Sequence, residues 1–395
     1  MPVLLGIVGL GSEVGLWYYT HQHTQSAADS AAITAATAYY VQGNSTGLAT
    51  QAKGTTAAYG FVAGSKGVTV TVNHPPASGT HTSTPSAVEV IVSQPQTRLF
   101  SALFSSSQLT VSARAVAIAS GGPGCVLGLD KAASGAVVIK GSSAVTLTGC
   151  SLMDNSTSSS ALSMIGAGTL SALSVSVVGG ISGAPSITTT PTSNAVTTGA
   201  GAAADPYANS SYPSFSGCDK HNFSSKKTET INPGVYCGGM SFNAGADVTL
   251  SPGIYYLDQG SLSVNGGATL TGTGVTLVFT SSSGSNYATA NINGGATVNL
   301  TAPTSGGTSG IVFFGDPNMP VGTSFKFAGG ASQTFGGAVY VKKGAVSFAG
   351  GSGTGHACTQ LVADTITFTG NSNFAIDCTG YGTKRLGAGL AKLVE

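Results

Sequence analysis

The sequence has few charged residues. They make up 7% of its 395 residues, and the formal net charge is only +1. In soluble cytoplasmic enzymes about a quarter of the residues are charged, so the composition of this chain lies outside that class. A near-zero net charge without a basic run gives no electrostatic reason to expect nucleic acid as a partner. Wholesale disorder is also disfavoured, because it requires low hydrophobicity and high net charge, whereas 41% of this chain is hydrophobic.

The sequence also lacks the common catalytic and metal-binding motifs. No GxSxG, HExxH or P-loop pattern occurs. His21 and His23 lie two positions apart on a predicted helix and so point away from each other. The other histidines, His74, His81, His221 and His356, each stand alone in the sequence. We therefore expect no metal, no cofactor and no enzymatic activity.

One enzymatic alternative depends on the aspartates. Glycoside hydrolysis commonly uses two carboxylates about 5 to 9 Å apart, and this sequence has no close Asp/Glu pair in its C-terminal two thirds. Neighbouring coils of a repetitive fold could still bring two of them together. Asp247 and Asp258 are the candidates, and solvated or turn-capping roles are the alternative for both.

Six cysteines fall into three successive pairs, with 25, 19 and 20 positions between partners. None forms a CxxC motif or a Cys/His cluster in sequence, which argues against zinc. The spacing predicts three local disulfides and therefore an oxidising compartment. The predicted pairs are Cys125 with Cys150, Cys218 with Cys237, and Cys358 with Cys378.

An apolar segment begins the chain. Residues 2–19 are apolar except for Ser12 and Glu13 and end in an aromatic cluster that includes Trp17. A spanning helix needs about 20 apolar residues, and aromatic residues favour the membrane interface. No positive n-region or cleavage site precedes Trp17, so we expect the segment to be retained. An unpaired carboxylate in hydrocarbon is costly, so Glu13 either pairs with a neighbouring subunit or lies near the interface.

Alanines recur in pairs four residues apart after this segment, which is helical spacing. They predict one helix over residues 1–42, about 58 Å long from residue 2 to residue 40. Alanine pairs at this spacing form a narrow face of small side chains against which another helix can pack closely. Alternatively, the alanines are present because alanine has the highest helix propensity. The predicted assembly residues are Glu13, Trp17, Gln25, Ala28, Asp29, Ala32 and Ala36.

Two alternating runs follow, at residues 68–72 and 88–92, then a helical pattern at 98–104 and a third alternating run at 109–119. These predict a compact β-β-α-β unit over residues 43–119. The GGPG sequence at 121–124 marks its boundary.

From Cys125 onward, short Val/Thr/Ile/Leu runs alternate with Gly, Ser and Asn. A local motif recurs from Asn243, Asn265, Asn293, Ala328 and Ala349, at offsets of 22, 28, 35 and 21. This period predicts a right-handed parallel β-solenoid over residues 120–383, with coils of about 21 residues and insertions. We expect loops or a lid over residues 181–232, and a terminal helix, tail or cap over residues 384–395.

The N-terminal residues resemble those of the TadG-like proteins of the bacterial Flp, or tight-adherence, pilus machinery. The resemblance lies in PVLLGIVGLGSEVGLWYY and in the Q-x-A-A-D-x-A-A-x-x-A-A pattern that begins at Gln25. The stretches EVIVSQPQTRLFSALF and SARAVA also look like the family, so the resemblance covers about the first 120 residues.

The strand runs and the repeat predict a mainly β protein. The resemblance implies a pilin-like domain, at the inner membrane or on the pilus, with the C-terminal bulk of the chain outside the cytoplasm. It implies a minor-pilin-like or pilus-associated structural or adhesive role. The implied partners are the membrane, pilin-like subunits or further copies of the chain; a surface polysaccharide or a host surface is a further expectation. The alternatives are a self-assembling filament subunit and a membrane-held β-helix enzyme that acts on polysaccharide.

Overall fold

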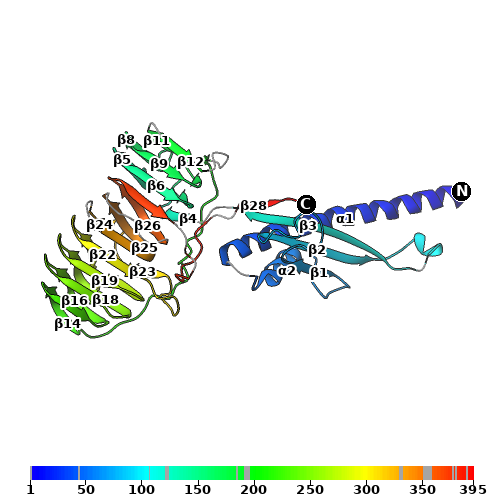
Figure 1. Ribbon diagram of the computed structural model, residues 1–395. Helices are drawn as coiled ribbons and strands as arrows, with labels where there is room; N and C mark the ends of the chain where they lie inside the picture. The colour runs from blue at the N-terminus through cyan, green and yellow to red at the C-terminus, as the bar shows by residue number, and fades with distance from the viewer. Residues whose placement is uncertain are drawn as a thin grey trace. The chain divides into compact units, whose positions relative to one another are not determined.

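The computed structural model describes residues 2–42, 45–105, 107–120, 124–183, 186–190, 196–328, 332–349, 358–375, 378, 380–387 and 390–395. The chain forms two compact units (Figure 1). Unit 1 contains Met1–Gly121 together with Gly389–Glu395, and unit 2 contains Gly122–Ala388. The protein is mainly β, with one long N-terminal helix and a large β-rich body.

The long helix α1 runs from Pro2 to Gln42 without interruption, as its sequence predicts. Its only proline is at the first position, where the missing N–H would have no partner within the helix in any case. Among the described residues, no helix is long and apolar enough to cross a membrane.

The rest of unit 1 is a small antiparallel sheet with one further helix. Its strands are ordered β1-β2-β3-β28. The elements are α2 (Leu48–Ala58), β1 (Thr69–Asn73), β2 (Ala87–Gln96), η1 (Ser101–Leu103), β3 (Leu109–Ser120) and β28 (Leu390–Leu393).

The predicted β-β-α-β order is wrong in two places. Helix α2 precedes the strands and was not predicted, because its 11 residues carry no clear apolar stripe. The predicted helix at 98–104 is a 3-10 turn of three residues.

The predicted terminal helix is strand β28, which pairs antiparallel with β3.

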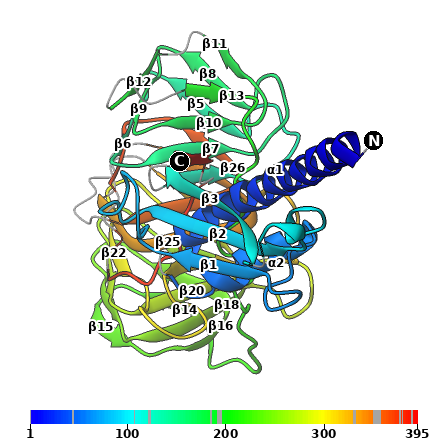
Figure 2. The same cartoon turned by 90° about the vertical axis from the view of Figure 1, so that its right-hand side faces the viewer.

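The core of unit 1 forms between α1 and the sheet (Figure 2). Six alanines on the C-terminal half of α1 have no exposed surface. They pack against valines of β2 and alanines of β3, and these small side chains let the helix lie close to the strands. The alanines are Ala27, Ala28, Ala31, Ala32, Ala35 and Ala36. The face predicted to receive another helix is therefore covered by the chain's own sheet.

Unit 2 consists of strands that pair in parallel with the strand of the preceding or following repeat. Its N-terminal strands are β4 (Gly124–Gly128), β5 (Val137–Gly141), β6 (Ala144–Thr148), β7 (Ser151–Asp154), β8 (Leu162–Gly166), β9 (Thr169–Ala172), β10 (Val175–Val177), β11 (Ile181–Gly183), β12 (Ser186–Thr189) and β13 (Val196–Thr198). Those that follow are β14 (Lys220–Ser225), β15 (Thr228–Ile231), β16 (Gly234–Phe242), β17 (Asp247–Leu250), β18 (Gly253–Val264), β19 (Thr269–Gly272), β20 (Val275–Thr280), β21 (Thr289–Ile292), β22 (Thr297–Thr301), β23 (Ile311–Gly315), β24 (Thr323–Phe327), β25 (Ser332–Phe348), β26 (Thr359–Phe368) and β27 (Ser372–Ala375).

The strand registers reproduce the predicted repeat. Phe242 pairs with Val264 and Val264 with Ile292, so each residue before a motif start lies opposite its counterpart one repeat later. Ile292 pairs in turn with Phe327, and Phe327 with Phe348. The pairing offsets are therefore those of the sequence motif. The asparagines that start three motifs also bond to one another, from Asn265 Nδ2 to Asn243 Oδ1 and from Asn293 Nδ2 to Asn265 Oδ1.

The spatial order of the strands differs from their order in the chain. Strand β26 pairs with β25 on one side and with β4 on the other. The repeats after residue 220 and those before residue 198 thus meet at β26, which Figure 1 draws in red beside β25. Sequence periodicity did not predict this, because periodicity defines the repeat and not which repeats become neighbours.

A connector of residues 199–219 joins the two sets of repeats, within the region predicted to be loops. The connector packs on the strands: Tyr207 is buried, and its hydroxyl donates to Gln360 Oε1 at 2.6 Å. Asp205 Oδ2 accepts a bond from the Tyr340 hydroxyl at 2.9 Å. The segment is thus bonded to strands distant in sequence. Short strands occupy parts of the predicted loop region on either side of it.

All three predicted disulfides are present. Cys125 is bonded to Cys150, Cys218 to Cys237, and Cys358 to Cys378. Each joins cysteines 19 to 25 positions apart, which is about the length of one repeat. Cross-links of this kind stabilise a fold mainly by restricting the unfolded chain.

Candidate interaction surface

Glu13 of α1 holds the turn between β2 and β3. Its side chain is 2% exposed. Its carboxylate accepts hydrogen bonds from the backbone N–H of Leu99 at 2.8 Å, from the backbone N–H of Ser101 at 2.7 Å and from the Ser101 hydroxyl at 2.8 Å. The sequence predicted a partner on another subunit or a position near the interface. The structure provides donors from the same chain in place of a partner on another subunit.

A second contact lies one helical turn earlier. A Cβ on Gly9 would be 2.7 to 2.8 Å from ring carbons of Phe100, which is closer than carbon atoms can approach. The Phe100 ring therefore lies directly against the helix backbone at Gly9. Since Gly9 and Glu13 are four residues apart, they lie on one side of α1. Residues 99–104, hereafter the tip, are thus fixed to the helix at two levels.

The tip exposes large apolar side chains. Leu99 is 58% exposed and Phe100 46%, while Leu103 and Phe104 are 83% and 80% exposed. Single exposed apolar residues are ordinary on protein surfaces, but four within six residues form a patch. The sequence identified the segment only as helical, because its leucine and phenylalanine spacing fits a helix as well as a turn.

Between Val8 and Tyr19, α1 is mostly apolar and is exposed on most of its circumference. At 3.6 residues per turn, the exposed side chains occupy all sides other than the one that carries Gly9 and Glu13. A helix that is hydrophobic all round is normally buried in a protein interior or a membrane. The exposed residues are Val8, Leu10, Val14, Leu16, Tyr18 and Tyr19.

Trp17 lies four residues after Glu13, on the same side of α1, and is half-buried. Its Nε1 is buried and has no hydrogen-bond partner in the described part of the chain. Trp17 is the only tryptophan in the sequence, so tryptophan fluorescence reports on this side of the helix alone.

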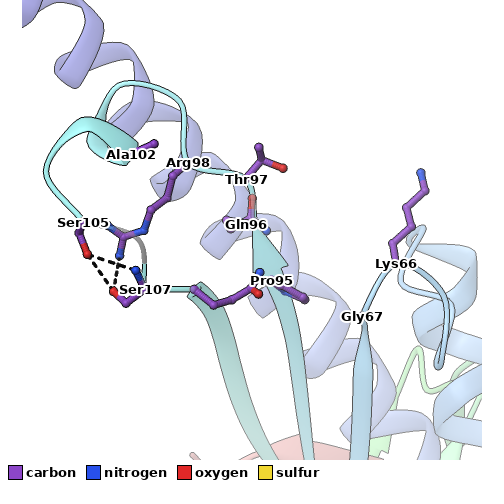
Figure 3. Close-up of a pocket in the computed structure, with 10 residues that line it drawn as sticks. Lys66, Gly67, Pro95, Gln96, Thr97, Arg98, Ala102, Ser105 and Ser107 are labelled. Atoms are coloured by element: carbon purple, nitrogen blue, oxygen red, sulfur yellow. Dashed lines mark hydrogen bonds between the residues drawn. The ribbon is translucent and has the colours of Figure 1, made fainter.

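A surface pocket of about 770 Å³ lies beside the tip (Figure 3). Lys66 and Arg98 are the cations among its lining residues, and none of the described lining residues is acidic. Arg98 extends toward Ser105 and Ser107, and its Nη2 donates to the Ser107 hydroxyl at 3.4 Å. The Arg98 Nε is buried and has no partner among the described residues. The pocket thus combines positive charge with unused donor capacity.

The remaining predicted assembly residues lie inside unit 1. Gln25 Nε2 donates to Asp29 Oδ1 at 2.7 Å and to the backbone oxygen of Arg114 at 3.0 Å, which ties α1 to β3. Ala28, Ala32 and Ala36 belong to the buried alanine face. These residues therefore contribute to the core of the unit and are separate from the exposed surface around Glu13.

The two candidate carboxylates of the enzymatic alternative lie in different strand ladders. Asp247 begins β17 and pairs with Thr228 and Thr269, whereas Asp258 lies in β18 opposite Cys237, in a different ladder. Both Asp258 oxygens accept bonds from Ser282, one from its N–H and one from its hydroxyl, each at 2.7 Å. Asp258 therefore holds a turn.

Among the described residues, one group of possible metal ligands contains a histidine. His221 Nδ1 lies 3.5 Å from Cys218 Sγ, and Cys237 completes a group of three possible ligands. Both sulfurs are joined in a disulfide and offer no thiolate. His23 faces the rings of Tyr19 and Phe61. His356 lies outside the described residues.

An ion-pair network that the sequence did not predict lies in unit 1. Glu89 on β2 is fully buried and accepts a bond from Arg114 Nε at 2.5 Å, and Arg114 Nη1 donates to Glu395 Oε2 at 2.6 Å. Burial raises the pKa of Glu89, but bonds from Asn73, Ala77 and Arg114 outweigh it and hold the pKa below its ordinary value. Single charged residues within the apolar runs of β2 and β3 were the available signal.

Comparison with known proteins gives a match at the N-terminus. No curated protein and no solved structure matches the chain. Residues 1–38 match the model of a family described as Putative Flp pilus-assembly TadE/G-like. The matched segment contains Gly9, Glu13 and Trp17 as well as the buried alanines. In this segment the chain is similar to Flp pilus-assembly proteins, which associates it with the cell envelope or the pilus.

Proposed function

We propose that the protein is a structural or adhesive component of a tight-adherence pilus system, minor-pilin-like or pilus-associated. In this proposal the first half of α1 lies in the membrane, and unit 2 is presented outside the cytoplasm. The observation that carries it is the exposed, apolar circumference of α1 between Val8 and Tyr19, within the segment that matches the pilus-assembly family. The alanine face of the second half of the helix is buried against the sheet of unit 1.

We further propose that unit 2 is a right-handed parallel β-solenoid that acts by binding a surface polysaccharide or a host surface. The repeat-to-repeat parallel pairing supports a solenoid, and parallel strand connections are almost always right-handed. The three disulfides suit an exported protein. We propose no catalytic role, since Asp258 is engaged at both oxygens. Turnover on a panel of polysaccharides would contradict this.

Membrane association can be tested with a pair of matched variants. Val14→Arg with Leu16→Arg alters two exposed positions in the first half of α1 and should leave unit 1 folded. We expect this variant to leave the membrane fraction, because arginine costs about 2.5 to 3.5 kcal/mol within hydrocarbon. Ile33→Arg, at an exposed position in the second half of the same helix, should remain membrane-bound.

A self-assembling filament subunit is the alternative, since an exposed apolar helix can also pack against further copies. Electron micrographs of purified protein distinguish the two. Filaments formed by the protein alone favour self-assembly. Monodisperse particles in detergent, together with loss of membrane association by the paired arginine variant, favour the membrane role.

A further inference from the structure

We infer that the tip and the pocket beside it form a docking surface for an anionic phospholipid bilayer. The inference rests on the proposed function, in which α1 enters the membrane, and adds a second point of contact with a stated lipid chemistry. It is argued from the attachment of the tip to α1, its apolar surface and the charge of the pocket.

The tip lies level with the exposed part of α1. Glu13 binds the backbone of Leu99 and Ser101, and Phe100 lies on Gly9. Both attachment points fall within the exposed apolar segment of the helix. A bilayer that surrounds this segment must therefore also meet the tip.

The composition of the tip suits the boundary between headgroups and acyl chains. Leu103 and Phe104 project into solvent with about four fifths of their surface exposed. Apolar and aromatic side chains flanked by cations are the features with which proteins enter the interfacial region. Arg98 immediately precedes the tip, and Lys66 lies across the pocket from it.

The charge of the pocket selects an anionic headgroup. Neither Lys66 nor Arg98 forms an ion pair within the described residues. The Arg98 Nη2 donates to the Ser107 hydroxyl, which lies beside the Ser105 hydroxyl. A phosphodiester supplies the negative charge and the acceptor oxygens that this set lacks. A second copy of the same surface is disfavoured, because a two-fold contact would bring like charges together.

Trp17 provides the first measurement. The protein is reconstituted into equimolar phosphatidylglycerol and phosphatidylcholine vesicles in which one lipid or the other is brominated, and quenching of the single tryptophan is compared. We expect stronger quenching by brominated phosphatidylglycerol. Each basic residue near an anionic surface favours binding about fivefold. The double variant Lys66→Gln with Arg98→Gln should therefore be quenched equally by the two brominated lipids. Lys53→Gln, at an exposed position of α2, should keep the stronger quenching by brominated phosphatidylglycerol.

A label on the tip provides the second measurement. All six native cysteines are paired, so a Leu103→Cys variant can be labelled with an environment-sensitive dye without reduction. Its emission should shift to the blue and be quenched by brominated lipid. The same dye on Val321→Cys, an exposed apolar position of unit 2, should keep the emission of a dye in water and should not be quenched by brominated lipid.

The outcomes separate the two proposals. Quenching of Trp17 with an unshifted label at position 103, or equal quenching by the two lipids, overturns the docking surface and leaves the membrane role of α1 intact. Absence of Trp17 quenching contradicts the proposed function itself. Preferential quenching by phosphatidylglycerol together with a shifted label supports the inference.

Discussion

The ring of Phe100 occupies the space in which Gly9 would carry a side chain. Gly9→Ala therefore forces the ring away from the helix, whereas Gly15→Ala enters open space. Replacing glycine in a helix interior normally stabilises by about 1 kcal/mol. We expect Gly15→Ala to slow amide exchange in the first half of α1, and Gly9→Ala to accelerate exchange at the tip. Equal effects of the two variants would contradict the contact.

Removal of the Glu13 carboxylate should free the tip without unfolding unit 1. Glu13→Ala leaves three donors on Leu99 and Ser101 without an acceptor. Hydrogen bonds to charged groups contribute about 1.5 to 3 kcal/mol, so exchange of these two amides should accelerate about 10- to 100-fold. Glu13→Gln keeps one acceptor oxygen, so its exchange rates should lie between those of the unaltered protein and Glu13→Ala. Unchanged protection in Glu13→Ala would show that the tip is held by other means.

Arg114 neutralises a carboxylate that is fully buried. Arg114→Met leaves Glu89 charged and without its ion-pair partner in the core of unit 1. Breaking a buried pair in this way costs about 3 to 5 kcal/mol. Trp17 fluorescence during urea unfolding follows unit 1 alone, and its transition should move to lower urea concentration. Glu89→Gln with Arg114→Met should recover part of the loss, since the buried charge is removed.

Glu395 makes the stability of unit 1 dependent on acid pH. Bonds from Thr80 and Arg114 lower the pKa of Glu395 to about 2. Its folded pKa lies below the ordinary value, so its stabilisation is present above about pH 4.5 and is lost as the pH falls toward 2. Glu395→Gln should lower the urea midpoint of unit 1 at pH 7, and the difference from the unaltered protein should vanish near pH 2. A difference that persists at pH 2 would assign the effect to geometry rather than charge.

Asp154 should have the opposite dependence in unit 2. Burial, with a contribution from the charge of Asp130, raises its pKa to about 6, and one of its oxygens lacks a partner among the described residues. An acid whose pKa is raised on folding destabilises the protein as the pH rises from about 4 to about 6. Asp154→Asn should stabilise unit 2 at pH 8 by about 3 kcal/mol and have little effect at pH 4. Calorimetry at the two pH values measures this.

Local sequence patterns predicted the elements that depend on local chemistry. The apolar and alanine-rich segments predicted α1, and the spaced motif predicted the registers from Phe242 to Phe348. The cysteine spacing predicted all three disulfides, because each joins cysteines that are only 19 to 25 positions apart in sequence. In each case, the residues that make the contact are the ones that form the pattern.

Contacts between distant segments were not predictable in this way. Glu13 was recognised as an unusual carboxylate, but its donors lie 86 and 88 positions away and include backbone groups that carry no sequence signal. The alanine spacing predicted a close-packing face and not its partner. The packing of that face on β2 and β3 follows from tertiary structure alone.

The position of β26 and β28 has a consequence for the order of biogenesis. Strand β4 is made early but has β26 as a neighbour, and β3 has the chain's last strand as its outer partner. A ribosome needs roughly 20 to 80 s to make a chain of this length. During that time the edges of β3 and β4 lack the strands that cover them. Both edges must therefore stay free of foreign strands until β26 and β28 have been made, and truncations near residue 358 should aggregate.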